Sequence, residues 1–139
     1  SIYSPEFYSS PTGYRMRIRL FLNGVDEACN TDRSIFFILM RGKYDAILEW
    51  PFSFKVSFSL LNQSSFNDDN QQHVTESFWP EKFSKCFERP RLEMNEPYGI
   101  EKFVSLDYFR RNYNHFVQDN AMFIRTEVIF LSDSDGIFY

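Results

Sequence analysis

The stretch that decides the fold class is Arg15-Met-Arg-Ile-Arg-Leu-Phe-Leu22. Its side chains alternate with the period of two that is typical of a β-strand. One face carries Met16, Ile18, Leu20 and Leu22, and the other face carries Arg15, Arg17, Arg19 and Phe21. The apolar face predicts a strand that packs on a core, so the arginine face must look outward. Asn23-Gly24 favours a turn and ends the strand.

Further strands are predicted on the C-terminal side of this stretch. Ser34-Ile-Phe-Phe-Ile-Leu-Met40 is short and rich in β-branched and aromatic residues, which indicates a strand covered on both faces. Lys55 to Gln63 alternates again, with Val56, Phe58 and Leu60 on the apolar face. A final strand is expected over 121–131. We expect at least these four segments to pair in sheets.

One or two short helical turns are predicted between the strands. In 44–49, Asp45 is the expected N-cap, and Trp50-Pro51 stops the helix because proline disfavours a helical residue before it. Ser105 is the expected cap of a second turn that runs to Arg111. The polar tract 64–72 cannot bury apolar area and therefore predicts a solvated loop. Its Asn and Asp residues lack the spacing of a calcium loop.

Composition supports one all-β domain over residues 1–139. The chain holds 17 Phe and 8 Tyr, which favour pleated surfaces, and its strands follow at short spacing without a βαβ rhythm. The prediction is an antiparallel β-sandwich. A net charge of −4 argues against nucleic acid as a partner, and the apolar run at 34–40 is far shorter than the roughly 20 residues of a membrane-spanning helix. Two cysteines in a chain of this size do not look like a disulfide framework and favour a reducing compartment.

Catalytic and metal sites are poorly supported by the residue pattern. Cys86 and His73 suggest a nucleophilic pair, but no activating motif surrounds the cysteine, and beside Phe87 it is more simply a small apolar filler. His73 and His115 are far apart, and neither has a cysteine at metal-ligand spacing. We therefore expect this domain to have no enzymatic activity and to bind neither a metal nor a cofactor.

The outward face of Arg15, Arg17, Arg19 and Phe21 has two interpretations. It is either a solvated basic edge that discourages aggregation, or a docking point for an acidic, extended peptide. The pattern alone leaves both interpretations open.

A series of motifs in order then resembles a known family. These motifs are Ser4-Pro-Glu-Phe-Tyr8, Gly13-Tyr14, Arg19-Leu-Phe-Leu-Asn-Gly24, Phe36-Phe-Ile-Leu-Met-Arg-Gly42, Tyr44-Asp-Ala-Ile-Leu48, Trp50-Pro-Phe52, Leu60-Leu-Asn-Gln63, His73-Val74, Phe87-Glu-Arg-Pro90 and Met94-Asn95. Together they resemble the C-terminal TRAF domain, the MATH fold of the tumour necrosis factor receptor-associated factors. The match extends over nearly the whole chain.

The resemblance implies an eight-stranded antiparallel β-sandwich that acts as a cytoplasmic signalling adaptor. Such domains bind short extended motifs in the cytoplasmic tails of TNF-receptor-type or interleukin and Toll pathway receptors and adaptors, and they trimerise through a preceding coiled coil. Neither that coiled coil nor the family's first strand is in this sequence, so about seven strands are expected here.

The resemblance also assigns peptide-binding residues. Arg19 matches the family's peptide-contacting arginine, and Phe21 stands where many members have tyrosine. An apolar pocket for the start of the motif is assigned to Phe36, Phe58, Phe78 and Phe87. Ser84, Lys85 and Cys86 fall on three consecutive serines that hold a glutamine, of which only the first is kept. Tyr98 and Gly99 lie where members have a serine-glycine pair or, in the interleukin and Toll pathway branch, an aromatic-glycine pair.

Two alternatives stay open beside the adaptor. The same fold serves as a substrate-recognition module of ubiquitin ligases and proteases. An extracellular MATH module is the other alternative, since Asn62-Gln63-Ser64 is a glycosylation sequon.

Overall fold

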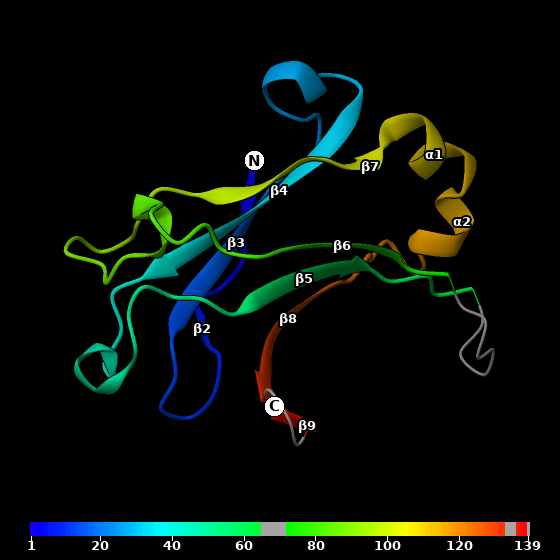
Figure 1. The fold of residues 1–139 in the computed structure, drawn as a ribbon. Coiled ribbons are helices and arrows are strands. Elements are labelled where there is room, and N and C mark those ends of the chain that lie inside the picture. The colour runs from blue at the N-terminus through cyan, green and yellow to red at the C-terminus, as the bar shows by residue number, and fades with distance from the viewer. Residues whose placement is uncertain (65–71, 133–135, 139) are drawn as a thin grey trace.

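The computed structural model describes residues 1–64, 72–132 and 136–138, and it shows two antiparallel sheets that pack face to face (Figure 1). The first sheet has the strand order β1-β3-β4-β7, with β2 also paired to β3. Its strands are β1 (Ile2–Tyr3), β2 (Phe7–Tyr8), β3 (Arg15–Phe21), β4 (Asp32–Met40) and β7 (Tyr98–Ser105). The second sheet has the order β6-β5-β8-β9 and consists of β5 (Lys55–Leu60), β6 (Val74–Phe78), β8 (Ile124–Ser132) and β9 (Gly136–Phe138).

The predicted all-β antiparallel sandwich is confirmed. Nine strand segments are present in the described residues, of which β1 and β2 are two residues each and flank successive parts of β3. If β1 and β2 are counted as one interrupted strand, the described residues contain eight strands, compared with the seven or so that were expected.

The core lies between the sheets and uses the faces that alternation predicted, apart from Leu22, which lies beyond the end of β3 and is exposed. Met16, Ile18 and Leu20 of β3 are buried in it, together with Val56, Phe58 and Leu60 of β5. The strand predicted to be covered on both faces is β4, where every residue from Ser34 to Met40 except Phe36 is buried. Burying one large apolar side chain contributes about 1.5–3 kcal/mol, so these faces hold the two sheets together.

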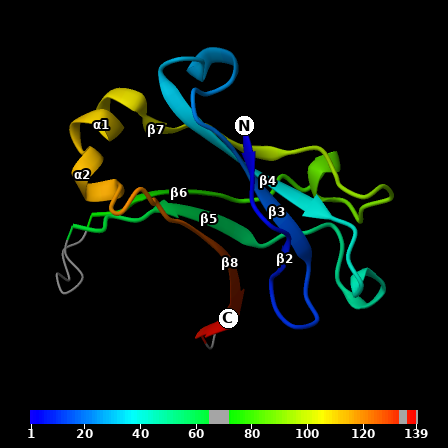
Figure 2. The same ribbon diagram turned by 180° about the vertical axis from the view of Figure 1, so that it is seen from behind.

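In the part of the chain that the structure describes, five short helices connect the strands: η1 (Asp26–Ala28), η2 (Asp45–Ile47), η3 (Lys85–Phe87), α1 (Leu106–Arg111) and α2 (Tyr113–Phe116). The helices α1 and α2 cover one end of the sandwich, and the loops with η2 and η3 lie at the opposite end (Figures 1 and 2).

The predicted cap of α1 is confirmed, and the predicted cap of η2 is wrong. The hydroxyl of Ser105 accepts a hydrogen bond from the backbone N–H of Tyr108 at 3.1 Å. At η2 the N-cap is Tyr44 without a side-chain bond, because Asp45 is already helical and its carboxylate accepts from the N–H of Gly42.

Two other expectations concern the ends of segments. β8 begins at Ile124 rather than at 121, because Gln118 and Ala121 close a tight turn through two backbone hydrogen bonds. Its central residues, Asp119 and Asn120, have φ of 53° and 60°, the left-handed conformation that such turns require. Most of the predicted polar loop 64–72 lies outside the described residues.

Candidate functional site

The arginine face of β3 looks outward, as the alternation predicted. Burial along the strand alternates strictly, with Met16, Ile18 and Leu20 in the core and the arginines and Phe21 half-buried on the outside. Arg19 is therefore available at the surface of the first sheet.

One transverse row of residues joins Arg19 to the edge of this sheet. Gly99 of β7 pairs in register with Phe36 of β4, and Phe36 pairs with Arg19 of β3. Residues that pair directly across antiparallel strands share a face, so Phe36 and Arg19 are neighbours on the outer face. Since strands lie about 4.8 Å apart, Arg19 is only about 10 Å from β7.

Arg19, Phe21 and Phe36 form what we call the outer patch. The guanidinium carbon of Arg19 lies 4.5 Å from the ring centroid of Phe21, and that ring meets Phe36 edge to face with centroids 5.6 Å apart. All three side chains are half-buried. The patch therefore presents a cation, held against aromatic rings, beside apolar surface that an acidic ligand can contact.

Phe58, Phe78, Phe87 and Tyr98 form a second group, which we call the inner cluster. The Tyr98 ring centroid lies 5.0 Å from the centroids of both Phe78 and Phe87, and Phe58 lies 6.0 Å from Phe78. Phe58 and Phe87 have no exposed surface, whereas Phe78 and Tyr98 are half-buried. The cluster thus extends from the core to the surface where β6 and β7 face each other.

Phe36 was assigned to one pocket with three of these residues, and the structure places it differently. Phe36 and Phe37 are successive residues of β4 and so point to opposite faces. Phe37 takes the inward position, with its ring centroid 6.4 Å from that of Phe87, and Phe36 packs on Phe21 outside. Phe58, Phe78 and Phe87 are brought together as expected.

Tyr98 connects the inner cluster to the loop before η3. Its hydroxyl donates a hydrogen bond to Oε1 of Glu81 at 3.2 Å. Burial among the rings raises the pKa of Tyr98, and the negative charge of Glu81 raises it further. The phenol therefore stays protonated near neutral pH and keeps this bond.

The segment Ser84-Lys85-Cys86 forms the start of η3. Ser84 is its N-cap, and its hydroxyl accepts from the N–H of Cys86 at 3.2 Å. Lys85 is exposed. The amide of Asn95, whose scaffold role sequence reasoning missed, donates to the carbonyls of Cys86 and Glu88 at 3.0 and 2.7 Å and fixes the turn.

β7 forms one edge of the first sheet, and within the described residues it pairs only with β4. Its backbone groups on the other side are open to pairing with an added strand. At Gly99 a Cβ atom would lie 2.0 Å from the carbonyl oxygen of Ile35 and 2.6 Å from Cα of Phe36. Glycine is therefore needed for β7 to lie this close to β4.

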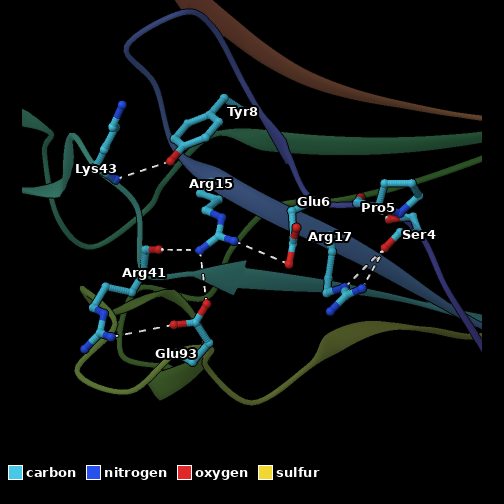
Figure 3. A network of polar contacts seen from close by, with 9 residues as sticks. All are labelled: Ser4, Pro5, Glu6, Tyr8, Arg15, Arg17, Arg41, Lys43 and Glu93. Carbon is cyan, nitrogen blue, oxygen red and sulfur yellow. Dashed lines mark hydrogen bonds and ion pairs between the residues drawn. The ribbon is translucent and has the colours of Figure 1, made fainter.

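The three arginines of the outer face have different partners. Arg15 forms ion pairs with Glu6 at 3.4 Å and Glu93 at 3.1 Å, and it also donates to the carbonyl of Arg41 (Figure 3). Arg17 donates to the carbonyl of Ser4. Arg19 donates to the hydroxyl of Ser1. Only Arg15 has its charge neutralised by carboxylates within the described part of the chain.

Tyr3 of β1 also lies at this face, and the sequence pattern did not indicate it. It pairs in register with Arg19, and its ring centroid is 4.8 Å from the Arg19 guanidinium carbon. A two-residue strand is too short to show a period, so no signal in the sequence identified it.

Other features of the described residues lie apart from this face. A groove of about 570 Å³ opens between β1 and β8, and none of the expected site residues lines it. Cys29 and Cys86 are free thiols. No group of three or more His, Cys, Asp or Glu is suited to a metal ion in 1–64, 72–132 and 136–138. No helix in these ranges is long and apolar enough to cross a membrane.

Comparison with known proteins identifies relatives that match most of this chain. Residues 1–125 match the family described as TRAF/meprin, MATH domain. TNF receptor-associated factor 1 of Mus musculus is 38% identical over 125 residues, which are 90% of this chain and 29% of that protein. TNF receptor-associated factor 2 of Homo sapiens is 39% identical over 128 residues, which are 92% of this chain and 24% of that protein.

A solved structure agrees with the sequence comparison. Notothenia coriiceps TRAF5 superposes with a TM-score of 0.86 at 33% identity, covering 96% of this chain and 64% of that one. The chain thus spans less than a third of the two relatives named above. With a family match over 125 of 139 residues and the same fold, the chain belongs to the TRAF/meprin MATH domain family.

Proposed function

We propose that this domain is an adaptor module that binds short, extended, acidic peptides from the cytoplasmic tails of receptors of the TNF-receptor type or their adaptors. The observation that carries the proposal is the transverse row, which connects the open edge of β7 at Gly99 to Phe36 and Arg19 in register. The relatives are named as TNF receptor-associated factors, which supports the choice of partner.

The geometry supports strand addition combined with side-chain recognition. The peptide backbone pairs with the open edge of β7, which supplies affinity without dependence on sequence. An apolar residue of the peptide packs at the half-buried rim of the inner cluster, beside Phe78 and Tyr98. An acidic residue reaches across the outer face to Arg19, whose guanidinium forms a charge-assisted hydrogen bond with the carboxylate.

A short peptide contacts only a small area of the domain, so the overall affinity depends on how many sites are occupied at once. A peptide of a few residues buries much less than the roughly 1,200 Å² of a stable protein interface, so a single site binds weakly. Useful avidity follows when several domains engage clustered tails at once. We therefore propose that the whole protein acts as a homotrimer joined outside this sequence.

The proposal is tested by charge reversal at Arg19. The side chain points outward, so Arg19→Glu leaves the fold intact but replaces attraction to an acidic peptide by repulsion. Calorimetric titration with the peptide Pro-Ala-Glu-Ala-Ala-Glu should show binding to the wild-type chain and none to the variant. Arg111→Glu, the same charge change at an exposed site on α1, is the control. Equal binding by both variants would remove Arg19 from the site.

A further inference from the structure

Arg17 and Tyr3 lie beside Arg19 and have no part in the peptide site described so far. Ile2 lines the groove between the sheets, so the next residue, Tyr3, points to the outer face. Its ring centroid lies 4.7 Å from the Arg17 guanidinium carbon and 4.8 Å from that of Arg19. One aromatic ring therefore contacts two guanidinium groups.

The two arginines are bound in the same manner. Nε and Nη2 of Arg17 both donate to the carbonyl of Ser4, at 3.2 and 2.9 Å. Nε and Nη2 of Arg19 both donate to the hydroxyl of Ser1, at 3.2 and 3.0 Å. In each case Nη1 has no partner among the described residues. Each arginine thus uses one edge to fix itself to the N-terminal segment and keeps donors for a ligand.

The surroundings of these two positive charges also differ from those of Arg15. Arg15 lies between Glu6 and Glu93 (Figure 3), whereas neither Arg17 nor Arg19 forms an ion pair within 1–64, 72–132 and 136–138. Two uncompensated positive charges therefore stand next to each other on a chain whose net charge is −4. This local excess of positive charge fits an anionic ligand.

We propose that Arg17 forms a second acid-binding subsite beside Arg19, and that the peptide partner carries two acidic residues in alternate positions. This inference rests on the proposed function. Arg17 and Arg19 are alternate residues of β3, so their Cα atoms lie about 7 Å apart, and alternate side chains of an extended peptide have the same spacing. Two carboxylates of one peptide thus meet two guanidinium groups.

Tyr3 is the positioning residue of this subsite. The face of an aromatic ring attracts a guanidinium, so the ring restricts both arginines to the outer face and lowers the entropy that each loses on binding a carboxylate. The ring is needed for this role and the hydroxyl is not.

Two labelled peptides test the second subsite on the 139-residue chain. Pro-Ala-Glu-Ala-Ala-Glu-Ala-Glu carries its last two glutamates in alternate positions, and Pro-Ala-Glu-Ala-Ala-Glu-Ala-Gln replaces the last of them with a neutral residue of the same size. Both peptides are amidated at the C-terminus, which removes the terminal carboxylate. In fluorescence anisotropy at low salt, the wild-type chain should bind the first about three-fold more tightly. Arg17→Gln should remove this difference, and Arg15→Gln, which makes the same charge change on the same face, should retain it.

The tyrosine variants and melting curves complete the test. Tyr3→Phe should keep the three-fold difference and Tyr3→Ala should reduce it. Melting curves should show that every variant is folded, with at most the small loss of stability expected when the ion pairs of Arg15 are broken. A difference that persists in Arg17→Gln, or that is lost equally in Arg15→Gln, overturns the second subsite. Equal binding of the two peptides by the wild-type chain overturns it while leaving the proposed function in place. Failure of both peptides to bind overturns both proposals.

Discussion

The outer patch and the inner cluster both contain aromatic side chains, yet they differ in their access to solvent. Phe58 and Phe87 of the inner cluster have no exposed surface and pack among other rings between the sheets. Arg19, Phe21 and Phe36 of the outer patch are half-buried and remain accessible. The buried rings of Phe58 and Phe87 therefore stabilise the fold, whereas the outer patch and the half-buried rim at Phe78 and Tyr98 are available to a ligand.

A second contrast lies within the outer face itself. Arg15 and Arg19 are four residues apart on one strand and point the same way. Arg15 is bound by Glu6 and Glu93, while Arg19 contacts only rings and a hydroxyl among the described residues. Two identical side chains on one strand thus have different roles: Arg15 stabilises the fold, and Arg19 is available to a partner.

Phe58→Ala tests the inner cluster with the largest expected effect. Truncating a fully buried phenylalanine leaves a cavity and lowers the free energy of unfolding by about 3–5 kcal/mol. Urea denaturation followed by tryptophan fluorescence measures the change. A variant that unfolds at the wild-type midpoint would show that Phe58 does not pack in the core.

Gly99→Ala tests the close contact between β7 and β4, where the two regions meet. The added Cβ would lie 2.0 Å from the carbonyl oxygen of Ile35, so a backbone must move. We expect a loss of about 3 kcal/mol in the free energy of unfolding, the upper part of the range for overpacking. Gly42→Ala is the control, because its nearest contact would be 3.0 Å, to a side-chain atom. Equal denaturation midpoints for both variants would contradict the register of β7.

Phe36→Ala separates the outer patch from the core. Because Phe36 is half-buried and packs on Phe21, its truncation should cost only about 1–2 kcal/mol of the free energy of unfolding. The variant should stay folded and lose peptide affinity. Denaturation and calorimetric titration of the same preparation check both expectations. A stability loss as large as that of Phe58→Ala would place Phe36 in the core instead.

Arg15→Gln and Arg19→Gln sharpen the contrast between the two arginines. Arg15→Gln breaks exposed ion pairs that are worth at most about 1 kcal/mol together, and it should not change peptide affinity. Arg19→Gln should leave stability within about 0.5 kcal/mol of wild type and weaken binding of an acidic peptide. Thermal melting and anisotropy measure the two properties. Reversed roles would show that Arg15 is the ligand-binding arginine.

The choice of peptide is expected to have the smallest effect. Phe21 has no hydroxyl to offer a peptide glutamate, and exposed Lys85 attracts a carboxylate rather than a glutamine amide. A Pro-x-Glu-x-x-(aromatic or acidic) peptide should therefore bind a few-fold better than a Pro-x-Gln-Glu peptide, by about 0.2–1 kcal/mol, with less difference at high salt. Anisotropy at two salt concentrations checks this. Preference for the glutamine peptide would show that Ser84 alone is enough to hold it.

The local pattern of the sequence determined which face most side chains occupy. The period of two in β3 and β5 placed Arg19 outside and Phe58 inside, because successive side chains of any strand point to opposite faces. The cap of α1 at Ser105 was equally predictable, since it depends on residues three positions apart. The same rule, applied to Phe36 and Phe37, separates them, although the resemblance had grouped Phe36 with the inner residues.

Only the tertiary structure decided which of these residues meet. Glu93 neutralises Arg15 from 78 positions away, Tyr3 reaches Arg19 through the pairing of β1 with β3, and Gly99 joins the row through the register of β7 on β4. Such contacts depend on strand order and register, which distant parts of the chain set together. The arginines of β3 look alike in the sequence for this reason, and they differ in the folded domain because their neighbours come from other strands and loops.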